Sequence, residues 1–274
     1  MRVRYAGAPH SLAGPELPEQ TWQLVDGEFL LRTDGEHRYH YRRGEGVTID
    51  RGPGADASVE PLYLSGSVYS AVASINGYYP IHASAVCHDG TVFAFTGESG
   101  AGKSTLCTAL AARGLPLFCD DTLVLDLSDP DSVLCLPGHK RLKLTEEALA
   151  LTGAARQEQV GEQIAKFYAQ PSSLHRGGPL PLAELLFLER GEGNAIEPLR
   201  GAERMVRLQD DHYTSLYTAA ARAFDASGTF DHLASLARRI AANRFVRPWD
   251  TARFAQGVAL AHSHIAGGSD KARA

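Results

Sequence analysis

The segment 97–104 restricts the fold of this chain more than any other feature. It reads Gly-Glu-Ser-Gly-Ala-Gly-Lys-Ser and matches the whole pattern G-x-x-x-x-G-K-[ST]. Residues 92–95 before it form a short apolar run suited to a buried strand, and residues 104–113 are predicted to form a helix. A strand, a glycine-rich turn and a helix in this order predict an α/β fold built around a P-loop.

The predicted loop carries the chemistry needed to bind a nucleotide. Its glycines let backbone N–H groups point at phosphate oxygens, and the start of the following helix adds positive charge. The Lys103 side chain can reach the β- and γ-phosphates, and the Ser104 hydroxyl can hold Mg²⁺. We therefore predict ATP and Mg²⁺ as ligands, because an incidental glycine-rich turn explains the full motif less well. The predicted nucleotide contacts are Gly97, Glu98, Ser99, Gly100, Ala101, Gly102, Lys103, Ser104 and Thr105.

The composition excludes several classes of partner. The chain has 274 residues, 44% hydrophobic and 22% charged, enough for one large core or a core with a small appended domain. Its net charge is -5 and it has no long basic stretch, so nucleic acid is not an expected partner. No apolar signal segment and no run near the ~18 apolar residues of a membrane span are present, which predicts a cytoplasmic protein with no membrane partner.

The cysteines follow no metal-binding or redox spacing. Cys87, Cys107, Cys119 and Cys135 are far apart and lie mostly in apolar runs. We expect reduced core residues rather than disulfides or zinc ligands.

Short apolar runs divide the chain into three parts. Residues 1–60 contain β-like runs separated by Gly and Asp turns. This pattern predicts a small antiparallel β-rich module. Residues 61–266 are predicted to form the P-loop domain, and 267–274 a frayed tail. The runs expected to form strands of the N-terminal module are 22–25, 28–32, 37–42 and 46–49.

Within the P-loop domain, strands are expected to dominate residues 81–136. The polar stretch 152–178, rich in Gln, Ser and Gly, is predicted to be mobile. A further buried strand is expected at 185–188, and helices are expected at 62–76, 146–151, 230–240 and 251–262.

Two adjacent carboxylates follow the predicted loop helix. Asp120 and Asp121 lie between apolar, strand-like segments. Buried paired carboxylates need cations, so a pair beside a phosphate loop suits Mg²⁺ and can accept a proton from a hydroxyl nucleophile. Neighbours on an extended chain point to opposite sides, so the two carboxylates can have different roles. An exposed turn with two capping aspartates is the alternative.

Two further positions are candidates for chemistry. His82 and Ser84 lie on one face of an extended segment that precedes the loop strand, although a histidine there is more often a structural core residue. Residues 137–144 group several cations after a turn. This group is either a solvated face or a source of charge, from Arg141 or Lys140, for a transferring phosphoryl group.

These residues together resemble the HPr serine kinase/phosphorylase superfamily, whose P-loop core is related to that of phosphoenolpyruvate carboxykinase. The resemblance rests on 81–86, 97–105 and the two aspartates, about a quarter of the chain. It implies a kinase in which His82 and Asp121 line the nucleophile side and Asp121 is the general base. It also implies that Asp120 acts with Ser104 near Mg²⁺, and that Lys103 and Arg141 contact phosphate.

The rest of the chain departs from the bifunctional enzymes of that family, which carry a larger N-terminal domain. It looks more like stand-alone HPr-kinase-related proteins of peptide biosynthesis, including kinases that phosphorylate lasso-peptide precursors on a C-terminal serine. We predict an ATP-dependent serine kinase acting on a peptide or small protein. The alternatives are a nucleotide-binding regulatory module without an acceptor and an HPr(Ser) kinase/phosphorylase of sugar-uptake regulation; homo-oligomerisation is left open.

Overall fold

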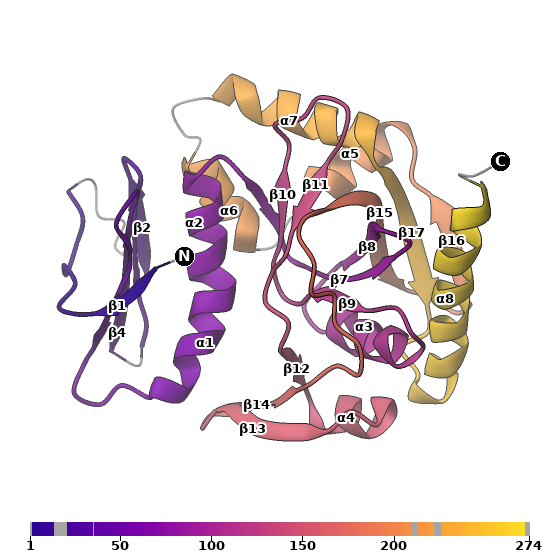
Figure 1. The fold of residues 1–274 in the computed structure, drawn as a ribbon, viewed down its shortest axis with the longest axis horizontal. Helices are drawn as coiled ribbons and strands as arrows, with labels where there is room; N and C mark the ends of the chain where they lie inside the picture. The colour runs from indigo at the N-terminus through magenta and orange to yellow at the C-terminus, as the bar shows by residue number, and fades with distance from the viewer. Residues whose placement is uncertain (1, 14–20, 35, 210–212, 222–225, 272–274) are drawn as a thin grey trace.

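The computed structural model describes residues 2–13, 21–34, 36–209, 213–221 and 226–271. These residues form a mixed α/β fold with sheets of five, nine and three strands. Figure 1 shows the five-stranded sheet at one side, a long helical segment beside it, and the nine-stranded sheet with its helices beyond. The predicted α/β class is confirmed at this level, and the relation of the core to phosphoenolpyruvate carboxykinase stays a prediction.

The N-terminal sheet contains all four predicted strands and one more. Its order is β1-β5-β4-β3-β2, antiparallel except that β1 runs parallel to β5. Asp26 and Gly27, both with positive φ, form the two-residue turn between β2 and β3, as a tight hairpin requires. The strands are β1 (Val3–Tyr5), β2 (Trp22–Val25), β3 (Glu28–Arg32), β4 (His37–Arg42) and β5 (Gly46–Arg51).

A nearly continuous helical segment packs on this sheet. It comprises η1 (Ala57–Val59), α1 (Glu60–Tyr63), the π-helical turn η2 (Leu64–Val68) and α2 (Tyr69–Ile75). The sequence predicted one helix at 62–76, so the observed segment starts earlier. Buried residues of the sheet, of this segment and of α6 (Tyr213–Ala221) form one apolar cluster.

The nine-stranded sheet positions the predicted loop. Its order is β6-β10-β11-β15-β8-β7-β9, and β17 pairs with both β15 and β16. The strands β8, β15 and β17 run parallel to one another, so their carboxyl ends meet at one edge. The strands are β6 (Tyr79–Ile81), β7 (Ala83–His88), β8 (Thr91–Thr96), β9 (Leu117–Cys119), β10 (Leu123–Asp126), β11 (Leu134–Leu136), β15 (Leu180–Arg190), β16 (Ala195–Pro198) and β17 (Ala241–Arg247).

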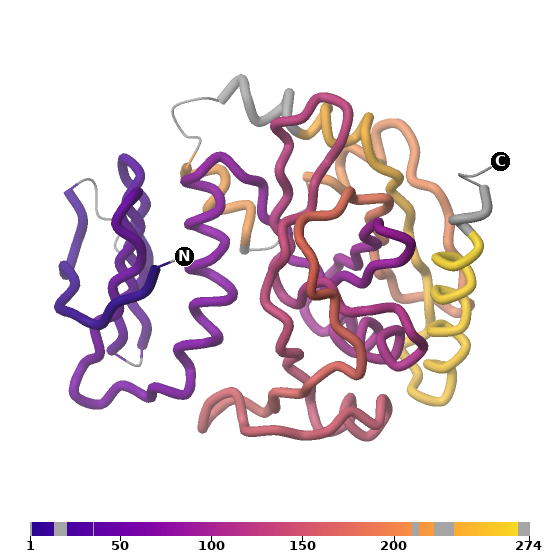
Figure 2. Tube along the Cα trace, viewed as in Figure 1, coloured from indigo at the N-terminus to yellow at the C-terminus, as the bar shows by residue number. Residues whose placement is uncertain are grey.

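Helices cover both faces of this sheet. Phe93 and Phe95 of β8 pack toward α3 (Lys103–Ala112) and α8 (Phe254–Lys271), while Val92 and Ala94 pack toward α5 (Gly201–Gln209) and α7 (Ala226–Arg239). This alternation is the period of two that a strand buried on both faces imposes. Figure 2 shows the C-terminal helix on the side of the molecule opposite the N-terminal sheet.

A small third sheet includes part of the polar stretch 152–178, where no strand was predicted. The stretch predicted to be mobile contains a hairpin of β13 (Arg156–Gly161) and β14 (Ile164–Ala169), and β14 also pairs with β12 (Leu142–Leu144). No alternation of apolar residues marks these strands, because β13 is an edge strand whose first four side chains are exposed. The helix α4 (Glu146–Thr152) lies between β12 and β13 in the chain.

The remaining predictions on the fold are mostly confirmed. The four cysteines are buried and free of disulfides. The strand expected at 185–188 lies within β15, and the helices expected near the C-terminus are α7 and the segment of η3 (Thr251–Arg253) with α8. The helix α8 continues to Lys271, inside the tail predicted from 267, and 272–274 lie outside the described residues. In the part of the chain that is described, no helix combines the length and apolarity needed to span a bilayer.

Candidate functional site

The loop 97–104 connects β8 to α3 as its sequence predicts. Gly102 caps α3 with a φ of 84°, and a Cβ there would come within 2.5 Å of the Arg247 guanidinium, so only glycine fits. The Lys103 Nζ donates hydrogen bonds to the backbone oxygens of Gly97, at 2.7 Å, and of Glu98, at 3.0 Å. The loop is therefore closed on its own lysine, which has to leave these oxygens to reach a phosphate.

Burial makes the Lys103 ammonium easier to deprotonate than an exposed lysine. It lowers the pKa of Lys103 to about 8, and the nearby carboxylates of Asp120 and Asp121 only partly offset that effect. A bound phosphate supplies the missing negative charge and favours the ammonium form. A strongly anionic ligand would therefore stabilise the charged form of Lys103 more than a neutral ligand would.

Arg247 supports the loop from a neighbouring strand. It is the last residue of β17, only 7% exposed, and donates a hydrogen bond of 2.5 Å to the backbone oxygen of Ala101. Burial lowers its pKa from the ordinary arginine value. No motif in the sequence marks this residue, because only the parallel pairing of β17 with β15, and of β15 with β8, brings it to the loop.

Asp120 connects the loop helix to β7. It is completely buried, and its Oδ1 accepts hydrogen bonds from Ser84, at 2.5 Å, and from Ser104, at 2.8 Å. Its Oδ2 is buried without a hydrogen-bond partner among the described residues. An unpartnered carboxylate oxygen beside a loop serine fits Mg²⁺, which prefers oxygen ligands and completes its shell with substrate phosphates and water.

A denser metal site is absent from the described part of the chain. The described residues contain no group of three or more His, Cys, Asp and Glu side chains arranged to hold a metal ion. Mg²⁺ bound beside phosphates commonly needs only one or two carboxylates from the protein. Asp120 and Ser104 remain the candidate metal ligands of this chain.

Asp121 faces the cleft. Its backbone has a φ of 73°, and the Thr122 N–H donates a hydrogen bond of 2.9 Å to the Asp120 carbonyl, so Asp121 is the centre of a tight three-residue turn. A non-glycine residue held at positive φ is strained, and such strain concentrates at functional sites. The turn directs one of two neighbouring carboxylates into the core and the other into the cleft.

Two side chains hold the Asp121 carboxylate. Lys143 Nζ lies 2.7 Å from Oδ2, and His82 Nδ1 lies 3.6 Å from Oδ1. His82 Nδ1 also donates a 2.8 Å hydrogen bond to the Asp121 backbone oxygen, which can only accept. Burial raises the pKa of Asp121, but Lys143 and His82 lower it by more, so the carboxylate stays ionised. An ionised, oriented carboxylate in a cleft can accept a proton.

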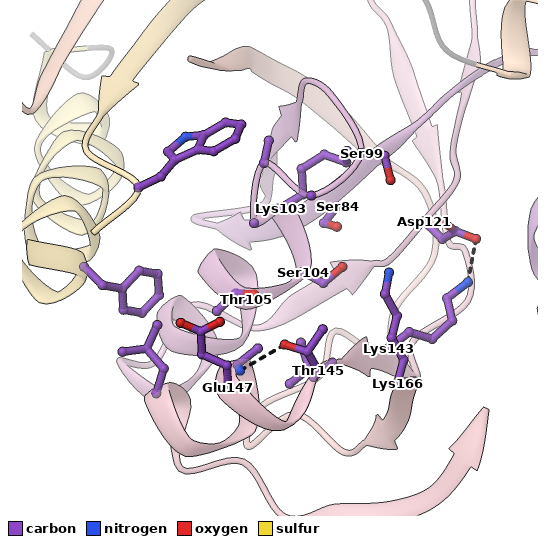
Figure 3. Close-up of a pocket in the computed structure, with 18 of the residues that line it drawn as sticks. Ser84, Ser99, Lys103, Ser104, Thr105, Asp121, Lys143, Thr145, Glu147 and Lys166 are labelled. Carbon is purple, nitrogen blue, oxygen red and sulfur yellow. Dashed lines mark hydrogen bonds and ion pairs between the residues drawn. The ribbon is translucent and has the colours of Figure 1, made fainter. Parts of the chain in front are cut away.

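The three-stranded sheet supplies the cations opposite Asp121. Lys143 on β12 pairs with Tyr168 on β14, and Lys166 is two residues from Tyr168, so both lysines lie on the same face. Figure 3 shows Lys143 and Lys166 side by side below Asp121. Lys166 lines the cleft and forms no hydrogen bond or ion pair with a described residue.

Arg141 lies elsewhere. Its guanidinium is 3.8 Å from the Tyr168 ring centroid and donates a hydrogen bond to Glu158, and it does not line the cleft. The structure therefore brings His82, Lys103, Ser104, Asp120 and Asp121 together and leaves Arg141 outside. Lys143, the middle residue of β12, lines the cleft and contacts Asp121.

His82, Lys103, Ser104 and Asp121 line one continuous cleft of about 920 Å³, within the range of small-molecule sites. Asp120 lies outside this lining and is hydrogen-bonded to Ser84 and Ser104, which belong to it. The predicted nucleotide contacts from Ser99 to Thr105 line the cleft, whereas Gly97 and Glu98 contribute the carbonyls that hold Lys103. Figure 3 shows Asp121, Lys143 and Lys166 at one end, and Thr105 and Glu147 on the other side of Ser104.

Comparisons with known proteins show little. No protein-family model matches the sequence, and no curated protein matches it. One solved structure with some likeness is the HPr(Ser) kinase/phosphatase from Coxiella burnetii, 13% identical, with coverage of 71% of this chain and 99% of that chain and a TM-score of 0.37. A likeness this distant carries no inference, so the function proposed below rests on the cleft.

Proposed function

We propose that the chain is an ATP-dependent kinase that transfers the γ-phosphoryl group to a serine hydroxyl of a peptide or small protein. The observation that supports this most is the division between two neighbouring carboxylates. Asp120 is buried against the loop serine, and Asp121 faces the cleft beside Lys143. A module that only binds nucleotide needs the first carboxylate and has no use for the second.

The donor would bind over the start of α3. Backbone N–H groups of the loop 97–104 and the helix N-terminus would meet the phosphates, and Lys103 would exchange its loop carbonyls for phosphate oxygens. Asp120 and Ser104 would hold Mg²⁺, and the ion would neutralise part of the phosphate charge.

The transfer step assigns a role to each residue at the Asp121 end. A serine hydroxyl oxygen forms a bond to the γ-phosphorus while the bond between that phosphorus and the β-bridging oxygen breaks, and ADP leaves. The hydroxyl proton passes to the Asp121 carboxylate. Lys143 and His82 keep that carboxylate oriented, and most of the rate comes from positioning and from cations near the developing charge.

Lys166 favours an acceptor that carries its own negative charge. It is an exposed cation in the cleft without an ion-pair partner among the described residues, and it faces the same space as Asp121. The C-terminal carboxylate of a peptide would meet this charge while the last side chain reaches Asp121. We therefore propose a C-terminal serine, as on a lasso-type precursor peptide, as the acceptor.

Mass spectrometry tests the acceptor. A serine-terminated peptide, the same peptide with an amidated C-terminus, and HPr are each incubated with enzyme and Mg-ATP, and phosphate is located on the products. We expect phosphate on the terminal serine and a slower reaction after amidation. Lys166→Gln should raise the KM for the free-acid peptide and leave the amidated peptide unaffected, whereas Lys140→Gln, outside the cleft lining, should change neither.

Two outcomes would replace the proposal. Efficient phosphorylation of HPr, with no activity on any serine-terminated peptide, would favour the HPr(Ser) kinase alternative. Tight ATP binding with no transfer to any hydroxyl acceptor would favour a regulatory nucleotide-binding module.

A further inference from the structure

The cleft has a second end that the transfer step leaves unused. It lies away from Asp121, where α4, the first turn of α3 and the segment between β17 and α8 meet. Figure 3 shows Thr105 and Glu147 on this side, across Ser104 from Lys143. Of the residues that line the cleft, Thr105 lies on α3, Glu147, Ala148 and Leu151 lie on α4, and Trp249, Asp250, Thr251 and Phe254 lie between the end of β17 and the start of α8.

An exposed tryptophan distinguishes this end. Trp249 is 41% exposed, and of the large hydrophobic side chains that are exposed in the described ranges it alone lines the cleft. A ligand that covers an exposed indole ring in a concave site removes apolar surface from water, which favours binding.

The Trp249 ring has a cation near it, on a residue outside the cleft lining. The Arg190 guanidinium lies 5.8 Å from the ring centroid, within the range of a cation–π contact, and Arg190 itself does not line the cleft. On the chain, Trp249 follows two residues after Arg247, which is fixed to the loop oxygen of Ala101. The indole is thus supported from outside the cleft and placed close to the phosphate loop.

A second aromatic ring and small apolar side chains complete the end. Phe254, the first residue of α8, lines the cleft and is 5.9 Å from the Arg247 guanidinium. Ala148 of α4 belongs to the same buried cluster as Phe254, and Leu151 packs against that cluster. Aromatic and aliphatic surfaces in a cleft suit a flat, uncharged ring system more than a phosphate.

We infer that Trp249 and Phe254 form the binding surface for the base of the donor nucleotide, so that the donor is a nucleoside triphosphate and not an inorganic polyphosphate. The inference rests on the proposed function, because Asp121 fixes which end of the cleft receives the γ-phosphate. A triphosphate bound over the start of α3 with its γ-phosphate toward Asp121 extends its nucleoside toward Thr105 and Glu147, the side on which the ribbon between β17 and α8, the segment that carries Trp249, approaches the cleft. The base then stacks on the indole.

Fluorescence of Trp249 tests the inference. The chain has two tryptophans, and Trp22 packs against Tyr217 in the N-terminal part, 5.1 Å between ring centroids, so a Trp22→Phe protein reports on Trp249 alone. The ligands are AMP-PNP, a non-hydrolysable ATP analogue, and tripolyphosphate, each with Mg²⁺. AMP-PNP should quench the fluorescence, and tripolyphosphate should compete with AMP-PNP without quenching.

Affinity measurements in the protein with Trp22 intact provide the second readout. Trp249→Ala should weaken AMP-PNP binding by tenfold or more, about the size found when an aromatic ring that stacks on a base is removed. Its affinity for tripolyphosphate should stay within about twofold by the same reasoning. Trp249→Phe should keep most of the AMP-PNP affinity, and Leu216→Ala, which removes an exposed apolar side chain outside the cleft, should change neither ligand.

The outcomes separate the two proposals. The base site would be overturned if AMP-PNP bound saturably without changing the Trp249 fluorescence, and if Trp249→Ala bound AMP-PNP with unchanged affinity. The kinase proposal would still stand. Equal losses of AMP-PNP and tripolyphosphate in Trp249→Ala would also overturn it, because the loss would then lie at the phosphates. Failure of the intact protein to bind either ligand would overturn both proposals.

Discussion

The Nζ atom of Lys143 lies 2.7 Å from Oδ2 of Asp121, and both side chains are largely buried. The two residues come from different sheets: Asp121 follows β9 of the central sheet, and Lys143 is the middle residue of β12. This ion pair therefore joins the small three-stranded sheet to the turn between β9 and β10 of the nine-stranded sheet, and it holds the candidate base in the cleft.

Substitution of Lys143 should measure how much the Lys143–Asp121 ion pair contributes to stability. Lys143→Met leaves Asp121 charged and nearly buried without its cation, so we expect a loss of about 3 kcal/mol in the free energy of unfolding. Adding Asp121→Asn should restore part of the loss, and chemical denaturation of the four proteins of the double-mutant cycle measures the coupling. Arg141→Met, on the exposed pair with Glu158, should have little effect. A coupling near zero would contradict the account.

Lys103 should dominate the binding of the triphosphate. Charge-assisted contacts to phosphate in a desolvated site are strong, so Lys103→Ala should weaken Mg-ATP binding or transfer by at least ~10²-fold. Isothermal titration calorimetry and initial rates measure the two effects, with Lys140→Ala as the control outside the cleft lining. The same affinity and turnover in folded Lys103→Ala and in the intact protein would disprove this role.

Ser104 and Ser84 offer a matched test of the metal site. Both hydroxyls donate to Oδ1 of Asp120, but Ser104 alone belongs to the loop. Ser104→Ala should therefore raise the Mg²⁺ concentration needed for half-maximal nucleotide binding, and Ser84→Ala should raise it much less. If the two variants respond equally to Mg²⁺, Ser104 acts only by orienting Asp120.

Stability at acidic pH should depend on Glu60, at the start of α1. Burial raises the pKa of Glu60, but hydrogen bonds from Arg51 and Tyr5 lower it by more, so its folded pKa is below the ordinary value. A lowered carboxyl pKa gives stability that is full above the unfolded pKa of about 4.3 and is lost as the pH falls through the folded pKa.

Urea unfolding between pH 7 and pH 3, followed by Trp22 fluorescence in a Trp249→Phe protein, measures this dependence. Glu60→Gln should be less stable than the intact glutamate at pH 7, and the difference should shrink as the pH falls. A difference that stays constant over this range would show that the ion pair does not contribute.

Local patterns explain why much of the fold could be predicted from the sequence. Alternating apolar residues and the Asp26-Gly27 turn specify the N-terminal hairpin, and a complete loop motif between a strand and a helix specifies the β8 to α3 connection. The sequence also suggested different directions for Asp120 and Asp121, but the reason differs: a tight turn with Asp121 at a φ of 73°, and not extended backbone, separates their side chains.

Long-range register explains most of what could not be predicted. Arg247 reaches the loop only through the pairing of β17 with β15, and Lys143 reaches Asp121 only because β12 joins a separate sheet. The hairpin of β13 and β14 had no apolar alternation to reveal it. Trp249 had no motif at all, and its place in the cleft depends on where β17 ends.

The most direct test of the central claim compares Asp121→Asn with the intact protein under single-turnover conditions, with the γ-phosphate of ATP labelled and a serine-terminated peptide as acceptor. The account predicts a transfer rate lower by ~10²–10⁴, the range for loss of a general base, with nucleotide affinity within a few-fold of the original. Asp126→Asn, at the end of β10 and outside the cleft lining, should keep both values. Transfer by Asp121→Asn at the unaltered rate would contradict the account and move the base to His82 or Asp120.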